Sequence, residues 1–246
     1  MVDLNSAVFR RYYCTTASRS HAASDDYYER SAAGLKRRFG QWLPANRDSV
    51  CLDLGCGCGE MLFLLEREGF QKTTGIDLDV EQLEHARRYV RGRLVTAEVP
   101  EYLSRCPSAS VDFVSAVNFL EHLSKDTLLT VLREVRRVLR TDGTLVAMVP
   151  NAVSPFGGLT RHWDITHEWA FTPNNFRQLA PLAGFEPAVL FRECGPVPHG
   201  LPSAIRFMLW QGIRVGIAAW FLIELGNVKD GIYTMDMLVR MHVPST

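Results

Sequence analysis

The sequence contains 246 residues, of which 47% are hydrophobic and 22% are charged. This composition is typical of a globular protein with one domain, or with one domain and an insertion. The 27 basic and 27 acidic side chains give a formal net charge of zero, which disfavours a nucleic-acid partner because such proteins usually present a basic surface. The six cysteines lack the spacing of a disulfide framework, which favours a reducing compartment.

The N-terminal residues 1–23 are polar and aperiodic, and we expect them to form a loose arm before one domain over residues 24–246. They lack the apolar run of a secretory signal, so we expect a cytoplasmic protein. Ser24 is suited to cap a helix that extends to about Leu43. The proline that follows Leu43 would stop this helix.

The next stretch, residues 50–60, reads as a buried strand, a glycine-rich turn and the start of a helix. Its glycines have the spacing Gly-x-Gly-x-Gly, and Glu60 stands where a dinucleotide site carries its third glycine. A nicotinamide-dependent oxidoreductase is therefore disfavoured. Asp53 precedes the turn, where a carboxylate would repel a pyrophosphate but could accept from an ammonium group or an ordered water.

The segment from Leu52 to Gly59 resembles motif I of the class I S-adenosylmethionine-dependent methyltransferases. The resemblance implies an α/β, Rossmann-like fold: a seven-stranded, mostly parallel sheet with helices on both faces, an antiparallel last strand and a helical insertion before it. It also implies S-adenosyl-L-methionine as the cofactor and S-adenosyl-L-homocysteine as the product. Motif I residues expected to contact this cofactor are Asp53, Gly55, Cys56, Gly57 and Gly59.

Methyltransferases of this type often place an N-terminal helix over the cofactor. Tyr27, Tyr28 and Arg30 in the first predicted helix are the corresponding candidates, and Arg30 could pair with the carboxylate of the methionine part. The alternative interpretation is aromatic packing beside a solvated arginine.

The second strand is predicted over residues 72–77 and ends in Asp77, 22 residues after Gly55. An acid at this position can accept hydrogen bonds from both ribose hydroxyls, and the resemblance assigns the same role to Asp77, with Leu78 beside it. Asp79 more plausibly caps the next helix, predicted over residues 80–91.

After the third strand, predicted over residues 93–97, the family often carries an acid that contacts the adenine amino group. Thr96 replaces the aspartate that is usual there. Glu98 is the candidate acid, and the backbone of Ala97 could serve equally.

The fourth strand, predicted over residues 111–117, is apolar enough to be central in the sheet. It leads into a stretch that resembles a post-strand motif of small-molecule methyltransferases, which often ends in Glu-His, here before Leu123. Some relatives bind a divalent metal with several acids at this point. Asn118 stands where such a site would have an acid, so we predict no metal and place Asn118 beside the cofactor. His122 either acts in catalysis or braces the following helix, predicted over residues 124–140.

A fifth strand is predicted over residues 144–149, and residues 150–172 then form a long acceptor loop. This loop combines His162, Asp164 and His167 with tryptophan and phenylalanine side chains, as a pocket for a sugar or another ring would require.

The run from Asp164 to Thr172 resembles methyltransferases that act on sugars and surface polysaccharides. Our first choice for the base that deprotonates the acceptor is His167, followed by His122 and His162, with Asp164 orienting a histidine. Two alternatives remain: the polar residues tie the loop to itself, or they bind a metal.

The last two strands are predicted over residues 187–192 and 232–243, separated by a helical insertion over residues 196–230. Within it, residues 204–225 are strongly apolar, but the longest uncharged stretch, 215–223, is too short to span a bilayer. One interpretation is a lid over the acceptor pocket or a contact in a homodimer. The other is an interfacial helix that makes peripheral membrane contact and brings the enzyme to a lipid-linked acceptor.

The sequence as a whole predicts an O-methyltransferase that acts on a hydroxyl group of a sugar or glycan, in polysaccharide biosynthesis. Alternatives are methylation of another small molecule, such as a quinone precursor or a lipid, and a catalytically silent methyltransferase-like binding subunit. The stretch after the fourth strand also lacks an Asn-Pro-Pro-Tyr-type motif, which further disfavours nucleic-acid methylation.

Overall fold

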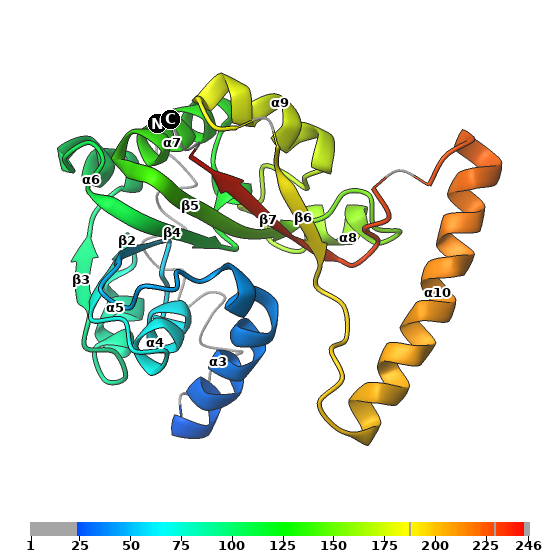
Figure 1. The fold of residues 1–246 in the computed structure, drawn as a ribbon, viewed down its shortest axis with the longest axis horizontal. Helices are drawn as coiled ribbons and strands as arrows, with labels where there is room; N and C mark the ends of the chain where they lie inside the picture. The colour runs from blue at the N-terminus through cyan, green and yellow to red at the C-terminus, as the bar shows by residue number, and fades with distance from the viewer. Residues whose placement is uncertain (1–23, 187, 229, 244–246) are drawn as a thin grey trace.

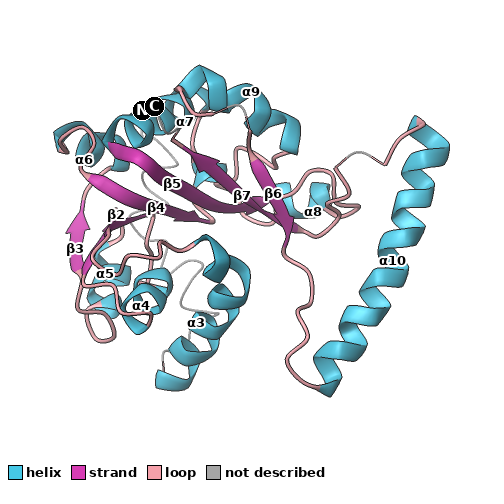
Figure 2. Ribbon diagram, in the orientation of Figure 1, coloured by secondary structure: helices cyan, strands magenta, loops and turns pink. Residues whose placement is uncertain are grey.

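The computed structural model describes residues 24–186, 188–228 and 230–243. The N-terminal arm expected over residues 1–23 lies outside the described part of the chain. One seven-stranded sheet forms the centre of the molecule, with the strand order β3-β2-β1-β4-β5-β7-β6 (Figure 2). Its strands are β1 (Val50–Leu54), β2 (Lys72–Asp77), β3 (Arg93–Thr96), β4 (Val111–Val117), β5 (Leu139–Pro150), β6 (Leu190–Glu193) and β7 (Asp236–His242).

The pairing pattern confirms the predicted fold. Strands β1 to β5 pair in parallel, and β7 runs antiparallel to both β5 and β6. The order reverses between β1 and β4, which leaves the carboxyl ends of these two central strands open on one edge of the sheet. Ligands of open parallel sheets bind at such a switch point.

Helices cover both faces of the sheet (Figure 1). One core cluster packs α6, α7 and α9 on one face, and two further clusters pack α3, α4 and α5 on the other. The apolar residues of each helix recur every three or four positions, so each helix buries one side and leaves the other in water. These helices are α3 (Asp25–Phe39), α4 (Glu60–Arg67), α5 (Val80–Ala86), α6 (Val99–Arg105), α7 (Lys125–Val138) and α9 (Pro173–Ala183).

The element boundaries differ from prediction in a few places. Helix α3 ends at Phe39 and is continued by a short 3-10 helix, η2 (Gly40–Trp42), and a second one, η3 (Leu120–His122), precedes α7. The acceptor loop contains a helix of its own, α8 (Gly157–His162). Strand β5 begins at Leu139, five residues before its predicted start at residue 144.

The predicted insertion is present as one long helix, α10 (Leu201–Leu225), between β6 and β7. It lies along one side of the domain, outside the two helical layers (Figure 1).

Candidate cofactor and acceptor site

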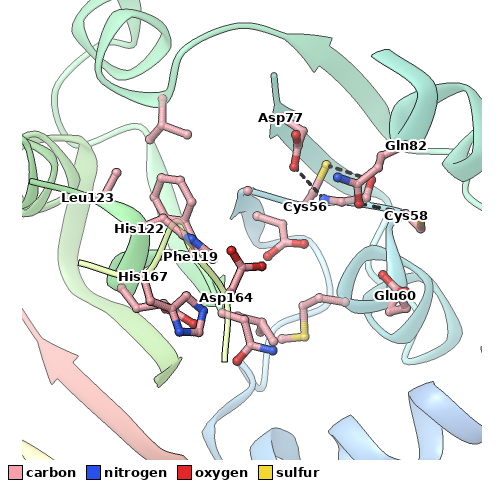
Figure 3. A pocket seen from close by; sticks show the side chains of 18 of the residues that line it. Cys56, Cys58, Glu60, Asp77, Gln82, Phe119, His122, Leu123, Asp164 and His167 are labelled. Atoms are coloured by element: carbon pink, nitrogen blue, oxygen red, sulfur yellow. Dashed lines mark hydrogen bonds between the residues drawn. The ribbon is translucent and has the colours of Figure 1, made fainter. Parts of the chain in front are cut away.

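A cavity of about 980 Å³ opens at the carboxyl ends of the parallel strands. Its walls include the residues that end or follow β1, β2, β3, β4 and β5, so the sheet itself gathers them at one place. One end of the cavity carries the glycine-rich turn, and the other carries the acceptor loop. Figure 3 shows Asp77 and Glu60 on one side, opposite His122 and His167.

The glycine-rich turn depends on backbone conformations that only glycine adopts without strain. Gly55 has a φ of 64°, and a Cβ added there would lie 2.5 Å from the ring of Phe119. The turn is held to β2 because the Gly57 N–H donates to Asp77 Oδ2 at 2.8 Å. Gly59 is the N-cap of α4 and does not line the cavity. The residues of the turn that line it are Gly55, Cys56, Gly57 and Cys58.

Asp77 stands at the tip of β2 and lines the cavity with Leu78. Its two carboxylate oxygens accept hydrogen bonds from the Gly57 and Asp79 backbone N–H groups, and burial raises the pKa of this carboxyl. Asp79 caps α5, as predicted, by accepting from the N–H groups of Glu81 and Gln82. The carboxylate of Asp77 is therefore fixed where a ribose is expected.

Asp53 is the penultimate residue of β1 and places a buried carboxyl group on the cavity wall. The Ser115 hydroxyl donates to Asp53 Oδ1 at 2.7 Å. Burial raises the pKa of Asp53 to about 7, although the Ser115 hydrogen bond opposes this shift. At neutral pH this group is therefore poised between its neutral and charged forms.

The residues expected to contact adenine also reach the cavity. Ala97 and Glu98 follow β3 and line the wall, and the Ala97 N–H donates to the backbone oxygen of Asp77 at 3.1 Å. Asn118 lines the opposite side after β4 and has a φ of 51°. These three residues therefore line the same cavity as the glycine-rich turn.

Two of the three candidates on the first helix, Tyr28 and Arg30, do not line the cavity. Tyr28 is fully buried, donates its hydroxyl proton to the Cys58 backbone oxygen at 2.6 Å and stacks on Tyr89. It therefore supports the glycine-rich turn from behind. Arg30 forms an exposed ion pair with Asp26 at 2.6 Å, so its solvated interpretation fits the structure.

The third candidate, Tyr27, does line the cavity, on a face of α3 whose other residues were not predicted from the sequence. The Tyr27 hydroxyl donates to Glu60 Oε1 at 2.8 Å, and the half-buried Arg38 brings a cation to the wall near Asp236. The spacing of this face is helical and could have revealed it from the sequence. Its members on the cavity wall are Tyr27, Ser31, Leu35 and Arg38.

His167 lies at the acceptor end of the cavity. Its Nδ1 atom is 2.8 Å from the backbone oxygen of Thr160 in α8. Because a carbonyl oxygen can only accept, Nδ1 carries the proton, and the lone pair of the neutral ring is at Nε2. Arg161 also donates to the His167 backbone oxygen. The helix within the acceptor loop therefore fixes both the place and the tautomer of His167.

His122 lies next to it, with the two imidazole rings 4.8 Å apart. Thr166 donates its hydroxyl proton to Asp164 Oδ1 at 2.7 Å, so Thr166 Oγ1 accepts from His122 Nδ1 at 2.8 Å. Asp164 thus orients a histidine, but it does so through Thr166. Burial, followed by the nearby His167, lowers the pKa of His122 to about 4.

Glu121 precedes His122 and was not singled out from the sequence. It is 1% exposed, and burial raises its pKa to about 8. Its Oε2 atom has no hydrogen-bond partner among the described residues. Donor atoms of Glu121, His122 and His167 lie within 4.8 Å of one another and could hold a metal ion. His162, by contrast, is exposed on α8 and does not line the cavity.

Comparison with known proteins agrees with this geometry. Residues 52–147 match a family model described as a methyltransferase domain. The chain is 34% identical over 100 residues to an uncharacterized protein of Methanocaldococcus jannaschii, which covers 41% of this chain and 36% of that protein. It is 31% identical over 122 residues to the 27-O-demethylrifamycin SV methyltransferase of Amycolatopsis mediterranei, which covers 48% of this chain and 44% of that enzyme.

The fold is also that of a solved structure. A crystal structure of an S-adenosylmethionine-dependent methyltransferase from Archaeoglobus fulgidus superposes with a TM-score of 0.63 and 19% identity, covering 86% of this chain and 94% of that one. The family match identifies residues 52–147 as a methyltransferase domain, and the fold is that of S-adenosylmethionine-dependent methyltransferases. The chain matches less than half the length of each of the two curated relatives named above.

Proposed function

We propose that the protein is an O-methyltransferase that transfers a methyl group from S-adenosylmethionine to a hydroxyl group of a sugar or glycan. The observation that carries this proposal is the position of His167. A histidine with its proton fixed at Nδ1 shares one cavity with the glycine-rich turn of the cofactor site. The polar residues of the cavity also fit S-adenosylmethionine, because they offer a separate partner to each polar end of the cofactor.

Each polar part of the cofactor has a candidate partner on the cavity wall. Asp77 would accept from the ribose hydroxyls, and Glu98 or the Ala97 backbone would contact the adenine amino group. At the amino-acid end, Asp53 would accept from the ammonium and Arg38 would pair with the carboxylate. Asp53 and Arg38 therefore take the place of Arg30, which was the residue predicted from the sequence to bind the amino-acid end of the cofactor.

For this reaction the protein has to position the cofactor and the acceptor and to transfer one proton. When bound, S-adenosylmethionine supplies a methyl group that its sulfonium sulfur already activates. His167 Nε2 accepts the acceptor's hydroxyl proton as the hydroxyl oxygen takes the methyl group, which leaves an ether, S-adenosylhomocysteine and an imidazolium. His122 is the weaker proton acceptor because burial lowers its pKa to about 4.

The composition of the outer end of the cavity supports a sugar as the acceptor. Trp163 lines it with 75% of its surface exposed, and Asp164 lies next to it. An open aromatic face beside a hydrogen-bonding group suits the apolar face and the hydroxyls of a sugar. The Amycolatopsis relative, named as a methyltransferase of an O-demethyl compound, supports a hydroxyl acceptor. It also keeps another small-molecule acceptor as the second candidate.

An acceptor panel tests the proposal. Purified protein would be incubated with deuteromethyl-labelled S-adenosylmethionine and with sugars, glycans, phenols and quinone precursors, and the products would be analysed by mass spectrometry. We expect the label on a hydroxyl of a sugar-containing acceptor. Label only on a phenol or an amine would overturn the sugar assignment, and cofactor binding without labelling of any acceptor would favour a catalytically silent subunit.

A further inference from the structure

Helix α10 exposes an unusually apolar surface. Among the described residues, it is the one helix long and apolar enough to cross a membrane by length and composition alone. Large apolar side chains point away from the domain along its whole length, and Val215 and Ile223 are 70% and 84% exposed. Further strongly exposed members are Leu201, Ile205, Met208, Leu209, Ile213 and Leu222. An aqueous protein rarely leaves so large an apolar patch uncovered.

The opposite side of α10 holds the helix to the domain. Arg214 forms an ion pair with Glu193 of β6 at 3.0 Å and donates to the Gly231 backbone oxygen. Phe221 stacks on Tyr233 with the ring centroids 5.5 Å apart. Arg214 and Phe221 are seven residues apart, so they share one side of the helix. These contacts fix which side of α10 faces outward.

The charges of α10 avoid the outward side. With 3.6 residues per turn, Arg206 and Glu224 each lie about 80° from Arg214, on the half of the helix that faces the domain. The exposed apolar side chains cover the other half, an arc of about 180° that contains no charged residue. A helix from a second copy would cover only about 100° of this arc and leave its flanks in water. Hydrocarbon would cover all of it.

The segments that connect α10 to the sheet restrict the orientation that the helix could take in a bilayer. Its ends lead through residues 194–200 and 226–235 to β6 and β7, which pair with each other at Glu193 and Met237. A helix that crossed the membrane would need one of these segments to return through the hydrocarbon with its backbone groups unpaired. The helix therefore has to lie in the plane of the membrane surface.

We propose that α10 is an interfacial helix that binds the protein to a lipid bilayer, with its uncharged outer half among the upper acyl chains. The helix also touches the acceptor loop: a cavity of about 230 Å³ lies between Trp220, Phe221 and Glu224 of α10 and residues 152–155. Membrane binding would bring this loop to the lipid surface. If the proposed sugar methylation is right, its acceptor is then a glycan carried on a lipid.

Vesicle flotation of the full chain tests the proposal. We expect the protein to float with vesicles of phosphatidylcholine alone, since the outer half of α10 carries no charge and needs no anionic lipid. The double variant Val215→Glu/Ile223→Glu should lower the floating fraction about tenfold or more. Leu182→Glu is the matched control, because Leu182 is a similarly exposed leucine, on α9, and should float like the wild type.

Three results would overturn the proposal. The first is no flotation with any vesicle. The second is flotation only with anionic vesicles that is lost in about 0.5 M salt, which would indicate charge attraction without insertion. The third is a dimer in light scattering that the double variant dissociates while no vesicle binds, which would assign the surface to a second copy. Equal affinity for S-adenosylhomocysteine in all variants would show that they are folded. Flotation does not depend on methyl transfer, so the two proposals can fail separately.

Discussion

His167 differs from the other two candidate histidines in both its position and its hydrogen bond. It lines the cavity, and the Thr160 carbonyl fixes its proton at Nδ1. His122 also lines the cavity, but burial lowers its pKa to about 4, and His162 is exposed outside it. Of the three, His167 therefore has the environment that best suits a base at neutral pH.

We predict that His167→Ala lowers turnover by about 10²–10⁴-fold, the usual contribution of a general base, and leaves the Kd of S-adenosylhomocysteine nearly unchanged. Steady-state kinetics at saturating acceptor, with calorimetry for the Kd, checks both parts. His162→Ala is the control and should keep wild-type turnover. Near-normal turnover of the His167 variant would transfer the role of base to His122.

The amino-acid end of the cofactor site should respond to pH through Asp53. Burial raises the pKa of Asp53 to about 7, so the free protein holds this proton below pH 7 and loses it above. An ammonium group prefers the carboxylate, which means that binding should release the proton. The affinity for S-adenosylhomocysteine should therefore rise by about tenfold from pH 6 to pH 8.

Titration at several pH values checks this prediction, with methylthioadenosine as the control ligand because it lacks both the ammonium and the carboxylate. Its affinity should stay constant with pH. Asp53→Asn should flatten the pH profile of S-adenosylhomocysteine, and Arg38→Gln should lower the affinity at every pH by removing the partner of the carboxylate. An Asp53→Asn profile that still rises through pH 7 would remove Asp53 from the site.

At the scale of the elements, the glycine-rich turn is the part that tolerates least change. Gly55 combines a positive φ with a close approach to the Phe119 ring, whereas Gly158 in α8 has open space where a Cβ would be added. Gly55→Ala should cost about 1–3 kcal/mol of unfolding free energy because it strains the backbone, and it should also weaken cofactor binding.

Gly158→Ala is the matched control and should be neutral or stabilising by up to about 1 kcal/mol, since alanine favours a helix. Denaturant unfolding measures both variants. A Gly55→Ala protein as stable as the wild type would mean that the turn can rearrange, and its part in shaping the cavity would have to be abandoned.

The elements themselves follow well from local sequence patterns. The strand, turn and helix around Gly55 and the acid at the tip of β2 lie where the sequence predicts them, because alternating or continuous apolar runs and cap residues are local signals. Helix α8 was not predicted, because its two glycines and the neighbouring tryptophan were interpreted as part of a loop. Its six residues are held by hydrogen bonds with Ser154 and His167, which the sequence does not display.

The site was predicted less completely, for a three-dimensional reason. Asp77, Glu98, His122 and His167 are found on the cavity wall because they follow strands or lie in the acceptor loop. Arg38 was not predicted, because Arg30 was chosen for its proximity to the tyrosines in sequence. The face of the helix on which each arginine lies was not considered. The link from Asp164 through Thr166 to His122 joins residues more than 40 positions apart, which no spacing rule reveals.

For the molecule as a whole, the account predicts methyl transfer without a metal. Glu121, His122 and His167 bring their donor atoms together, but burial raises the pKa of Glu121 to about 8, so this group is a neutral acid at pH 7 and a weak ligand. Turnover should be unchanged after dialysis against a chelator. Loss of turnover that a divalent ion restores would show instead that these three residues bind a metal and that His167 is not the base.

Three segments lie along one edge of the sheet: the glycine-rich turn, the acceptor loop and the apolar helix α10. This arrangement follows from the topology, because the parallel strands end at the cavity and the connection from β6 to β7 carries α10 past the acceptor loop. The roles proposed for the turn and for the acceptor loop both depend on the cavity being a site for S-adenosylmethionine.

Calorimetric titration of the purified full chain with S-adenosylhomocysteine, and separately with NADH, tests that claim most directly. The account predicts binding of S-adenosylhomocysteine at one site per chain and no binding of NADH, because Glu60 replaces the third glycine of a dinucleotide site. Binding of NADH in place of S-adenosylhomocysteine would contradict the account at its centre.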